Sequence, residues 1–262
     1  MTTWFRKNLI RIYMVIGFTY LFVPILYTFI FSFNDYVKSN LVWRGFTLNN
    51  WKQPCGVLDI CPALGNSIKI GLLSTFVATI LGTMIAFALG RYAFSGRSAV
   101  NTLIFLPMAS PELVLGASLL TIFLNLGFNL GFWTIVIAHV MFCISFVVVT
   151  VKARIASLDP RLEQAAMDLY ADERETFRRV TLPLVAPGIA GAALLSFSLS
   201  FDDFIITNFN SGTTVTFPLY VYTHAERGLP AQANVIGFAM FFLALIVVVL
   251  GQVVQSKRKV AK

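Results

Sequence analysis

Charged residues are scarce in this chain of 262 residues: Asp, Glu, Lys and Arg together make up 12% of it, whereas hydrophobic residues make up 57%. A soluble globular domain usually carries about 25% charged residues. The chain therefore has more apolar side chains than one water-facing domain can bury, which excludes an ordinary soluble enzyme and a disordered chain. We expect its main solvent to be the lipid bilayer.

Motifs for catalysis are missing as well. The segment GRYAFSGRS at residues 90–98 has five residues between its glycines and no Lys, so it is not a G-x-x-x-x-G-K-[ST] phosphate loop. The chain has no H-E-x-x-H motif and only two His residues, which leaves no ligand set for a metal ion. We therefore expect no catalytic residues, no cofactor and no metal site, and we expect any ATP hydrolysis to occur in a separate subunit.

Cysteine is also rare, with three residues, too few for a disulfide scaffold. Cys143 lies in an apolar run, whereas Cys55 and Cys61 lie in a polar stretch between Pro54 and Pro62. If that stretch faces an oxidising compartment, Cys55 and Cys61 can form a disulfide, and two free thiols are the alternative.

Long apolar segments are what the chain does have. Each of six segments is long enough to cross a bilayer core as a helix of about 20 residues: 9–33, 67–89, 100–126, 131–151, 184–208 and 233–254. The pattern predicts an all-α polytopic membrane protein with six transmembrane helices in a single domain over residues 1–262. An outer segment near residues 34–65 and a hydrophilic loop at 152–183 complete it.

Lys and Arg are distributed unevenly around these segments. Most of them lie near the N-terminus, near residues 91–97, in the 152–183 loop and at the C-terminus, which are all on one side if the chain crosses six times. This bias predicts that both termini and the 152–183 loop are cytoplasmic. It also accounts for the net charge of +8 through the anionic membrane surface, without nucleic acid.

The hydrophilic loop has the pattern of two short helices. Asp159 before Pro160 is typical of a helix start, and Asp172 with Glu175 forms a capping-box variant that opens a second helix. The first helix carries one apolar stripe, formed by Leu162, Ala165, Ala166 and Leu169. We expect Pro183 to end the second helix. Isolated helices of about ten residues are marginal in water, so this pair must pack on the membrane surface or on a partner protein.

This loop resembles the EAA loop of permease subunits in ABC importers, in which a short helix docks onto the ATPase subunit. Gln164, Ala165 and Ala166 take the E-A-A places, with Glu163 beside them, and Tyr170 takes the place of a Gly. A positive φ would cost Tyr170 about 1–2 kcal/mol, so we expect that turn to be built differently. The resemblance implies that the ATPase-coupling residues are Glu163, Gln164, Ala165, Ala166, Asp168, Leu169, Tyr170, Phe177, Leu182 and Pro183. A membrane-surface helix pair without a partner is the alternative.

Four further segments resemble the permeases of spermidine/putrescine importers: PELVLG at 111–116, AHVMFCISFVVVTVKAR at 138–154, SFDDFIIT at 200–207 and TFPLYVY at 216–222. The resemblance implies a type I ABC importer permease in the cell inner membrane that forms half of a translocation pathway. It also implies the partners: an ABC ATPase subunit dimer, a second permease subunit in a heterodimer, and an extracytoplasmic polyamine-binding protein.

Three acidic residues lie within the predicted spans, where ionisable groups are costly and mark functional sites. They are Glu112, Asp202 and Asp203. No Lys or Arg shares their depth, so we expect their partners to lie outside this chain, and three carboxylates suit a cation. Glu112 can instead cap a half-helix that restarts after Pro111. Adjacent residues point about 100° apart on a helix, so one of the two aspartates faces the pathway, and which one is open.

Two tyrosines in the last outer segment, Tyr220 and Tyr222, can stack on an alkyl-ammonium chain by cation–π contact. His139 lies in the middle of a span with no second metal ligand, which favours a hydrogen-bonded packing role. An importer of another small solute, an ATPase-independent secondary carrier and a membrane scaffold are the alternative functions.

Overall fold

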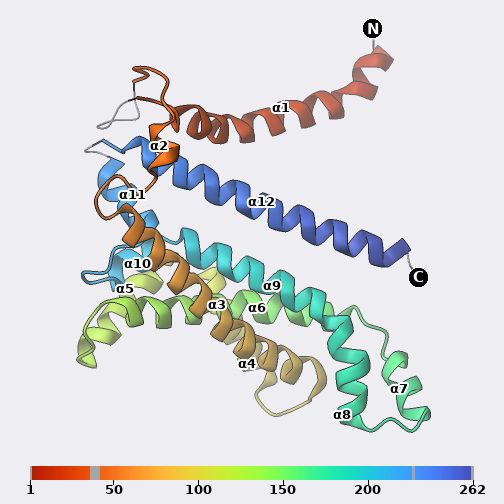
Figure 1. The fold of residues 1–262 in the computed structure, drawn as a ribbon. Coiled ribbons are helices and arrows are strands. Elements are labelled where there is room, and N and C mark those ends of the chain that lie inside the picture. The colour runs from red at the N-terminus through yellow and green to blue at the C-terminus, as the bar shows by residue number, and fades with distance from the viewer. Residues whose placement is uncertain (1, 36–41, 226–227, 261–262) are drawn as a thin grey trace. The chain divides into compact units, whose positions relative to one another are not determined.

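The computed structural model describes residues 2–35, 42–225 and 228–260. Over these residues it consists of helices and loops, with one isolated antiparallel bridge between Asn34 and Phe46 (Figure 1). The chain falls into two compact units: the first unit is Met1–Cys61 with Val221–Lys262, and the second unit is Pro62–Tyr220. The all-α class is confirmed, whereas the single domain over residues 1–262 stays a prediction. Residues 36–41 of the predicted outer segment lie outside the described residues.

Among the described residues, five helices are long and apolar enough to cross a bilayer, and a bent pair makes a sixth span if it is counted as one. The five are α1 (Thr2–Phe31), α3 (Ile60–Arg91), α6 (Phe132–Ala156), α9 (Leu182–Asp202), which continues α8, and α12 (Ala231–Val260). The shorter helices are α2 (Asn49–Lys52), α4 (Arg97–Ala109), α5 (Glu112–Asn125), α7 (Arg161–Asp168), α8 (Glu173–Thr176), α10 (Ile205–Asn210) and α11 (Phe217–Ala225).

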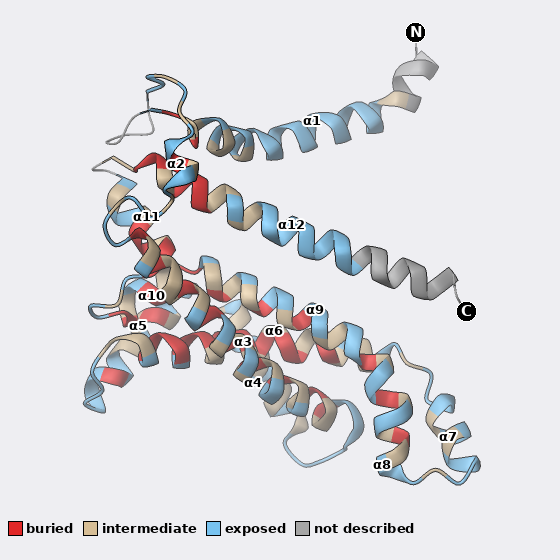
Figure 2. Ribbon diagram, in the orientation of Figure 1, coloured by how far each residue is buried: buried red, intermediate tan, exposed pale blue. Residues whose placement is uncertain are grey.

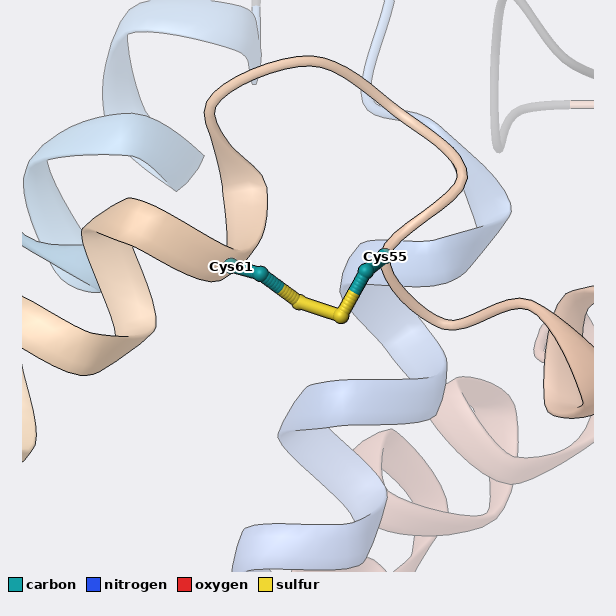
Figure 3. The surroundings of a disulfide bond; sticks show 2 residues. All are labelled: Cys55 and Cys61. Atoms are coloured by element: carbon teal, nitrogen blue, oxygen red, sulfur yellow. A yellow bond between two sulfur atoms is a disulfide. The ribbon is translucent and has the colours of Figure 1, made fainter.

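In the first unit, α1 packs against α12, with the rings of Phe29 and Phe238 4.6 Å apart. Side-chain hydrogen bonds hold the described residues of the loop that follows α1. The Asn50 side chain donates to the main-chain oxygens of Ser32 and Asn34, and Trp51 Nε1 donates to Ser32 Oγ at 3.0 Å. A disulfide between Cys55 and Cys61 then ties the end of this loop to the first turn of α3 (Figure 3).

In the second unit, α6 is the central helix. Its apolar residues are buried along most of its length, as Figure 2 shows, and it packs against α9, α4 and α10. Small residues of α3 lie directly against α6: at Gly82, an added Cβ would meet the Val147 side chain at 2.6 Å. Close packing through small residues is the usual way in which helices associate in lipid, where no hydrophobic force drives them together.

The third predicted span, 100–126, is not one straight helix. The helices α4 and α5 are bent by 107° at the break between Ala109 and Glu112. Pro111 has no N–H to continue the ladder and disfavours helical backbone at Ser110, whose φ of −80° and ψ of 140° are extended. After the break α5 packs against α10.

The fifth predicted span, 184–208, is wrong at both ends. Pro183 does not end the second loop helix, because α8 continues through a turn of π-helix at Phe177–Thr181 into α9. A π turn shifts the hydrogen-bond register, so a helix can accommodate a residue that lacks an N–H. At the other end α9 stops at Asp202, and α10 is a separate helix.

We predict that Gly82→Ala destabilises the protein. The new methyl group would overlap the Val147 Cβ, 2.7 Å away, and a fully buried β-branched side chain cannot move aside. The expected loss is about 1–3 kcal/mol, measured as a lower unfolding temperature of the purified protein in detergent. The control is Gly191→Ala on α9, where an added Cβ meets nothing within 4 Å. A Gly82→Ala protein as stable as the control would contradict the close packing of α3 on α6.

Candidate functional site

The junction between α9 and α10 separates the two adjacent aspartates. Asp202 is the last residue of α9 and its side chain is exposed. Asp203 leaves the helix with a φ of −63° and a ψ of 126°, and its side chain is buried. The two carboxylates therefore point in different directions, as the 100° argument predicts, although the cause is a helix break rather than a continuous helix.

The Asp203 carboxylate is occupied by donors from α10. Its Oδ1 accepts from the main-chain N–H of Ile206 at 3.3 Å, and its Oδ2 accepts from the N–H and the hydroxyl of Thr207 at 2.8 and 2.9 Å. These contacts satisfy N–H groups at the start of α10, which have no partner within their own helix. Asp203 is thus the cap that allows a new helix to begin in the buried part of the second unit.

His139 of α6 joins this cluster from the other side. Its Nε2 lies 3.2 Å from Asp203 Oδ2 and 3.0 Å from Thr207 Oγ1, and its Nδ1 lies 2.7 Å from Ser200 Oγ. The imidazole and the Asp203 carboxylate are both almost fully buried. The expectation that the intramembrane acids have partners only outside this chain is therefore wrong for Asp203, because its partner in this chain is a histidine rather than a Lys or Arg.

Glu112 is the first residue of α5 and is exposed. It directly follows the Pro111 break, so the half-helix start foreseen from the sequence is present. The N-terminal half of α5 lies on α10, because Gly116 lets the two helices approach: an added Cβ would lie 2.9 Å from the Phe209 ring. The Asn210 side chain also donates to the Gly116 carbonyl at 3.3 Å.

This packing gathers the three carboxylates at one end of α5. Asp202 and Asp203 directly precede α10, which packs against α5, the helix that begins at Glu112. In the part of the chain that the structure describes, neither Glu112 nor Asp202 forms an ion pair. Glu112 and Asp202 therefore form an exposed acidic pair. The third acid, Asp203, is buried, and its carboxylate oxygens already accept hydrogen bonds within the chain.

The two tyrosines lie on α11, not in an irregular loop. Tyr220 is 1% exposed, so its ring belongs to the packed interior of the second unit, whereas Tyr222 is 63% exposed. Tyr222 is thus the one of the two that presents a ring at the surface.

In the hydrophilic loop, α7 is anchored by one polar contact to the end of α3. Glu163 forms an ion pair with Arg91 and also accepts a hydrogen bond from Thr181 Oγ1 at 2.6 Å. Arg91 in turn donates to Thr181 Oγ1 at 3.1 Å. The three residues connect α3, α7 and the π turn before α9. The sequence does not predict Arg91 and Thr181 as partners of Glu163. Arg91 is 72 residues from Glu163, and a contact between such distant residues leaves no local sequence pattern.

The turn that ends α7 has the geometry that glycine usually provides. Tyr170 has a φ of +65°, its N–H donates to the Met167 carbonyl at 2.9 Å, and the Ala171 N–H donates to the Ala166 carbonyl at 3.2 Å. This pair of bonds is a Schellman motif with Tyr170 in the left-handed position. The expectation of a differently built turn is therefore wrong: the turn is the one that Gly would make, with a Cβ-bearing residue in it.

The rest of the predicted coupling residues lie on both sides of this loop. Phe177 packs edge-on against Phe87 of α3, with ring centroids 5.3 Å apart. No residue of α7 is buried. The two leucines of the apolar stripe are exposed, Leu162 to 45% and Leu169 to 81%, and so is the neighbouring Tyr170, to 99%. The exposed coupling residues are Gln164, Ala165, Asp168, Leu169, Tyr170, Leu182 and Pro183, and the partly buried ones are Glu163, Ala166 and Phe177.

Comparison with known proteins points to one family of sequences. The family described as "Binding-protein-dependent transport system inner membrane component" matches residues 78–259. The spermidine/putrescine transport system permease protein PotC of Haemophilus influenzae is 35% identical over 258 residues, which cover 98% of this chain and 99% of that protein. The putrescine transport system permease protein PotI of Escherichia coli is 35% identical over 230 residues, which cover 84% of this chain and 81% of that protein.

Solved structures share the fold at lower sequence identity. A bacterial ABC transporter involved in the import of the acidic polysaccharide alginate has a chain with a TM-score of 0.64 and 17% identity, and the match covers 98% of each chain. An alginate ABC transporter in complex with a pentasaccharide-bound periplasmic protein has a chain with a TM-score of 0.66 and 16% identity over 94% of each chain.

We predict opposite stability effects for the two adjacent aspartates. Asp203→Asn replaces one accepting oxygen of a buried cap with an NH₂ group that faces other donors, and should cost about 1–3 kcal/mol of unfolding free energy. Asp202→Asn, its neighbour and matched control, should leave stability unchanged because the side chain is exposed. Thermal unfolding of the two purified variants in one detergent gives the comparison. Equal unfolding temperatures for the two variants would show that Asp203 is not a structural cap.

Proposed function

Because this chain belongs to the family of binding-protein-dependent transport system inner membrane components, we propose that it forms half of the pathway by which a polyamine crosses the membrane. The chain is a multi-pass permease subunit of an ABC importer and not an enzyme, since ATP is hydrolysed by a separate subunit in this family. The substrate class follows from its relatives, which transport spermidine and putrescine. The observation that carries the proposal within this chain is the exposed pair of carboxylates, Glu112 and Asp202.

Glu112 and Asp202 bind the cation directly, whereas Asp203 contributes indirectly, because it caps α10. An ammonium group needs acceptor oxygens that are not already engaged, and in the described structure the oxygens of Asp203 accept from Ile206, Thr207 and His139. The exposed carboxylates supply negative charge at a helix break, and broken helices are a common construction for substrate sites in membranes. Tyr222 offers a ring for cation–π contact, whereas buried Tyr220 contributes packing.

The outward face of α7 is the docking surface for the ATPase subunit, of which the importer has two copies. Its apolar residues are exposed in the isolated chain although a helix of eight residues needs a surface to be stable. The Arg91, Glu163 and Thr181 cluster then transmits movement of α7 to α3 and to the start of α9. A second permease subunit in a heterodimer and an extracytoplasmic polyamine-binding protein complete the assembly.

The orientation follows from chemistry at the two ends of α3. Its first turn carries the disulfide of Cys55 and Cys61, which persists in an oxidising compartment. Its last residue, Arg91, binds the hydrophilic loop. A helix of 32 residues spans about 48 Å, enough to place these ends on opposite sides of the membrane. These two ends support an extracytoplasmic disulfide and a cytoplasmic α7, and the distribution of Lys and Arg supports cytoplasmic termini.

We predict that neutralising the exposed pair lowers polyamine uptake. Cells that lack this permease should lose uptake of labelled spermidine and recover it with the wild-type gene. Asp202→Asn and Glu112→Gln should each restore about a tenth of it, since one lost charge interaction of ~1.4 kcal/mol is a factor of ten. Asp59→Asn, which removes a carboxylate before α3, should restore it fully.

Two results would contradict this proposal in different ways. Full uptake by both neutral variants would leave the substrate in place and remove these carboxylates from the pathway. Unchanged spermidine uptake after deletion, in a strain without another polyamine importer, would mean that the solute is a different one.

We predict that the Tyr170 side chain is an ATPase contact. Tyr170→Gly relieves a left-handed strain of about 1–2 kcal/mol, so it should stabilise the turn. If the ring contacts the ATPase, the same variant should nevertheless recover several-fold less ATPase on co-purification. Tyr170→Phe keeps the ring and should bind normally, and Tyr170→Asn is the control that tolerates the left-handed region without a ring. Normal recovery of ATPase with Gly would exclude the contact.

A further inference from the structure

His139 lies at the break between α9 and α10, and this position matters for the transport pathway as well as for packing. It is 1% exposed and lies on α6, which supplies no residue to the exposed acidic pair. Its three partners, Ser200, Asp203 and Thr207, come from the end of α9, from the break and from α10. One side chain therefore holds both sides of a helix break.

We infer that His139 is a positioning residue of the transport pathway: by binding both sides of the break between α9 and α10, it fixes the direction in which Asp202 presents its carboxylate. This inference rests on the proposed role of Asp202. The origin of the partners supports it, since Ser200 lies on α9 and Thr207 on α10, on either side of Asp203 at the break. With these three side chains held by His139, the adjacent Asp202 points elsewhere, and it is exposed.

Both ring nitrogens of His139 lie within hydrogen-bond distance of partners. Nδ1 faces the Ser200 hydroxyl, and Nε2 faces the Asp203 carboxylate and the Thr207 hydroxyl oxygen. The Thr207 hydroxyl then donates its own proton to Asp203 Oδ2. Every polar atom of the imidazole has a partner, which is the condition for a buried polar cluster to fix one geometry.

The surroundings leave the cluster little freedom. Cys143, one turn along α6 from His139, is fully buried and its thiol donates to the Ser196 carbonyl of α9 at 3.5 Å. Ile206, beside Thr207, is fully buried in the same apolar core. A substitution at His139 therefore changes the hydrogen bonds at the break more than it changes the contact between α6 and α9.

The test compares His139→Leu with His139→Gln, alone and together with Asp202→Asn. Uptake of labelled spermidine by the whole importer in proteoliposomes is divided by the amount of folded complex, so that loss of stability alone does not count. Leu removes all three hydrogen bonds, whereas the Gln amide can donate to Asp203 in place of Nε2–H. We expect about a tenfold loss with Leu and recovery of at least half of wild-type uptake with Gln. Phe142→Leu, a buried apolar change one turn away, is the control and should keep uptake.

The double variant decides whether His139 acts through Asp202. If it does, His139→Leu causes no further loss in the Asp202→Asn background, because residues that act as one unit are not additive. A loss that multiplies, about a hundredfold for the double variant, would overturn the inference and leave the acidic pathway intact. Normal uptake per folded complex with His139→Leu alone would also overturn the inference and leave the acidic pathway intact. Full uptake with Asp202→Asn alone would instead overturn the pathway role of Asp202, and the inference with it.

Discussion

A helix that ends inside a lipid bilayer leaves main-chain N–H and C=O groups without water to bind them, and each such group costs several kcal/mol. The second unit of this chain ends helices within its predicted spans at two places, and the arrangement of its polar residues follows from that constraint. At the first break Pro111 has no N–H to satisfy. At the second, Asp203 accepts from the first N–H groups of α10. The exposed carboxylates of Glu112 and Asp202 lie directly beside these two breaks: Glu112 follows Pro111, and Asp202 precedes Asp203.

The two breaks also explain why the acids can be near one another and still differ in role. In a continuous fifth span, Asp202 and Asp203 would be consecutive residues of one helix and would point about 100° apart. The break turns one of them into a buried structural acid and leaves the other exposed. Packing of α5 on α10 through Gly116 then joins the helix that begins at Glu112 to the helix that follows Asp202, although the two acids are 90 positions apart in the sequence.

Features with a local cause were predictable from the sequence. Apolar length located five of the spans, the Asp172 cap accepts from the Glu175 N–H at 2.6 Å as its pattern predicts, and the three intramembrane acids were found by composition alone. Features that depend on tertiary contacts were not. Hydropathy cannot show a 107° bend, because both halves of the pair are apolar. The three partners of His139 lie 61–68 residues away in the sequence and Arg91 lies 72 residues from Glu163, and the helical register that aligns them exists only in the folded chain.

The disulfide between Cys55 and Cys61 has a consequence for biogenesis. During synthesis both thiols are reduced, and they can be oxidised only after the segment before α3 has been delivered across the membrane. A chain inserted with the opposite orientation would keep both thiols in the reducing cytoplasm, where such bonds rarely persist. The redox state of these two residues therefore reports the orientation in which the chain was inserted. A thiol reagent applied to unfolded chains would label Cys55 and Cys61 of the inverted molecules. In the correctly inserted molecules the disulfide would protect both residues from the reagent.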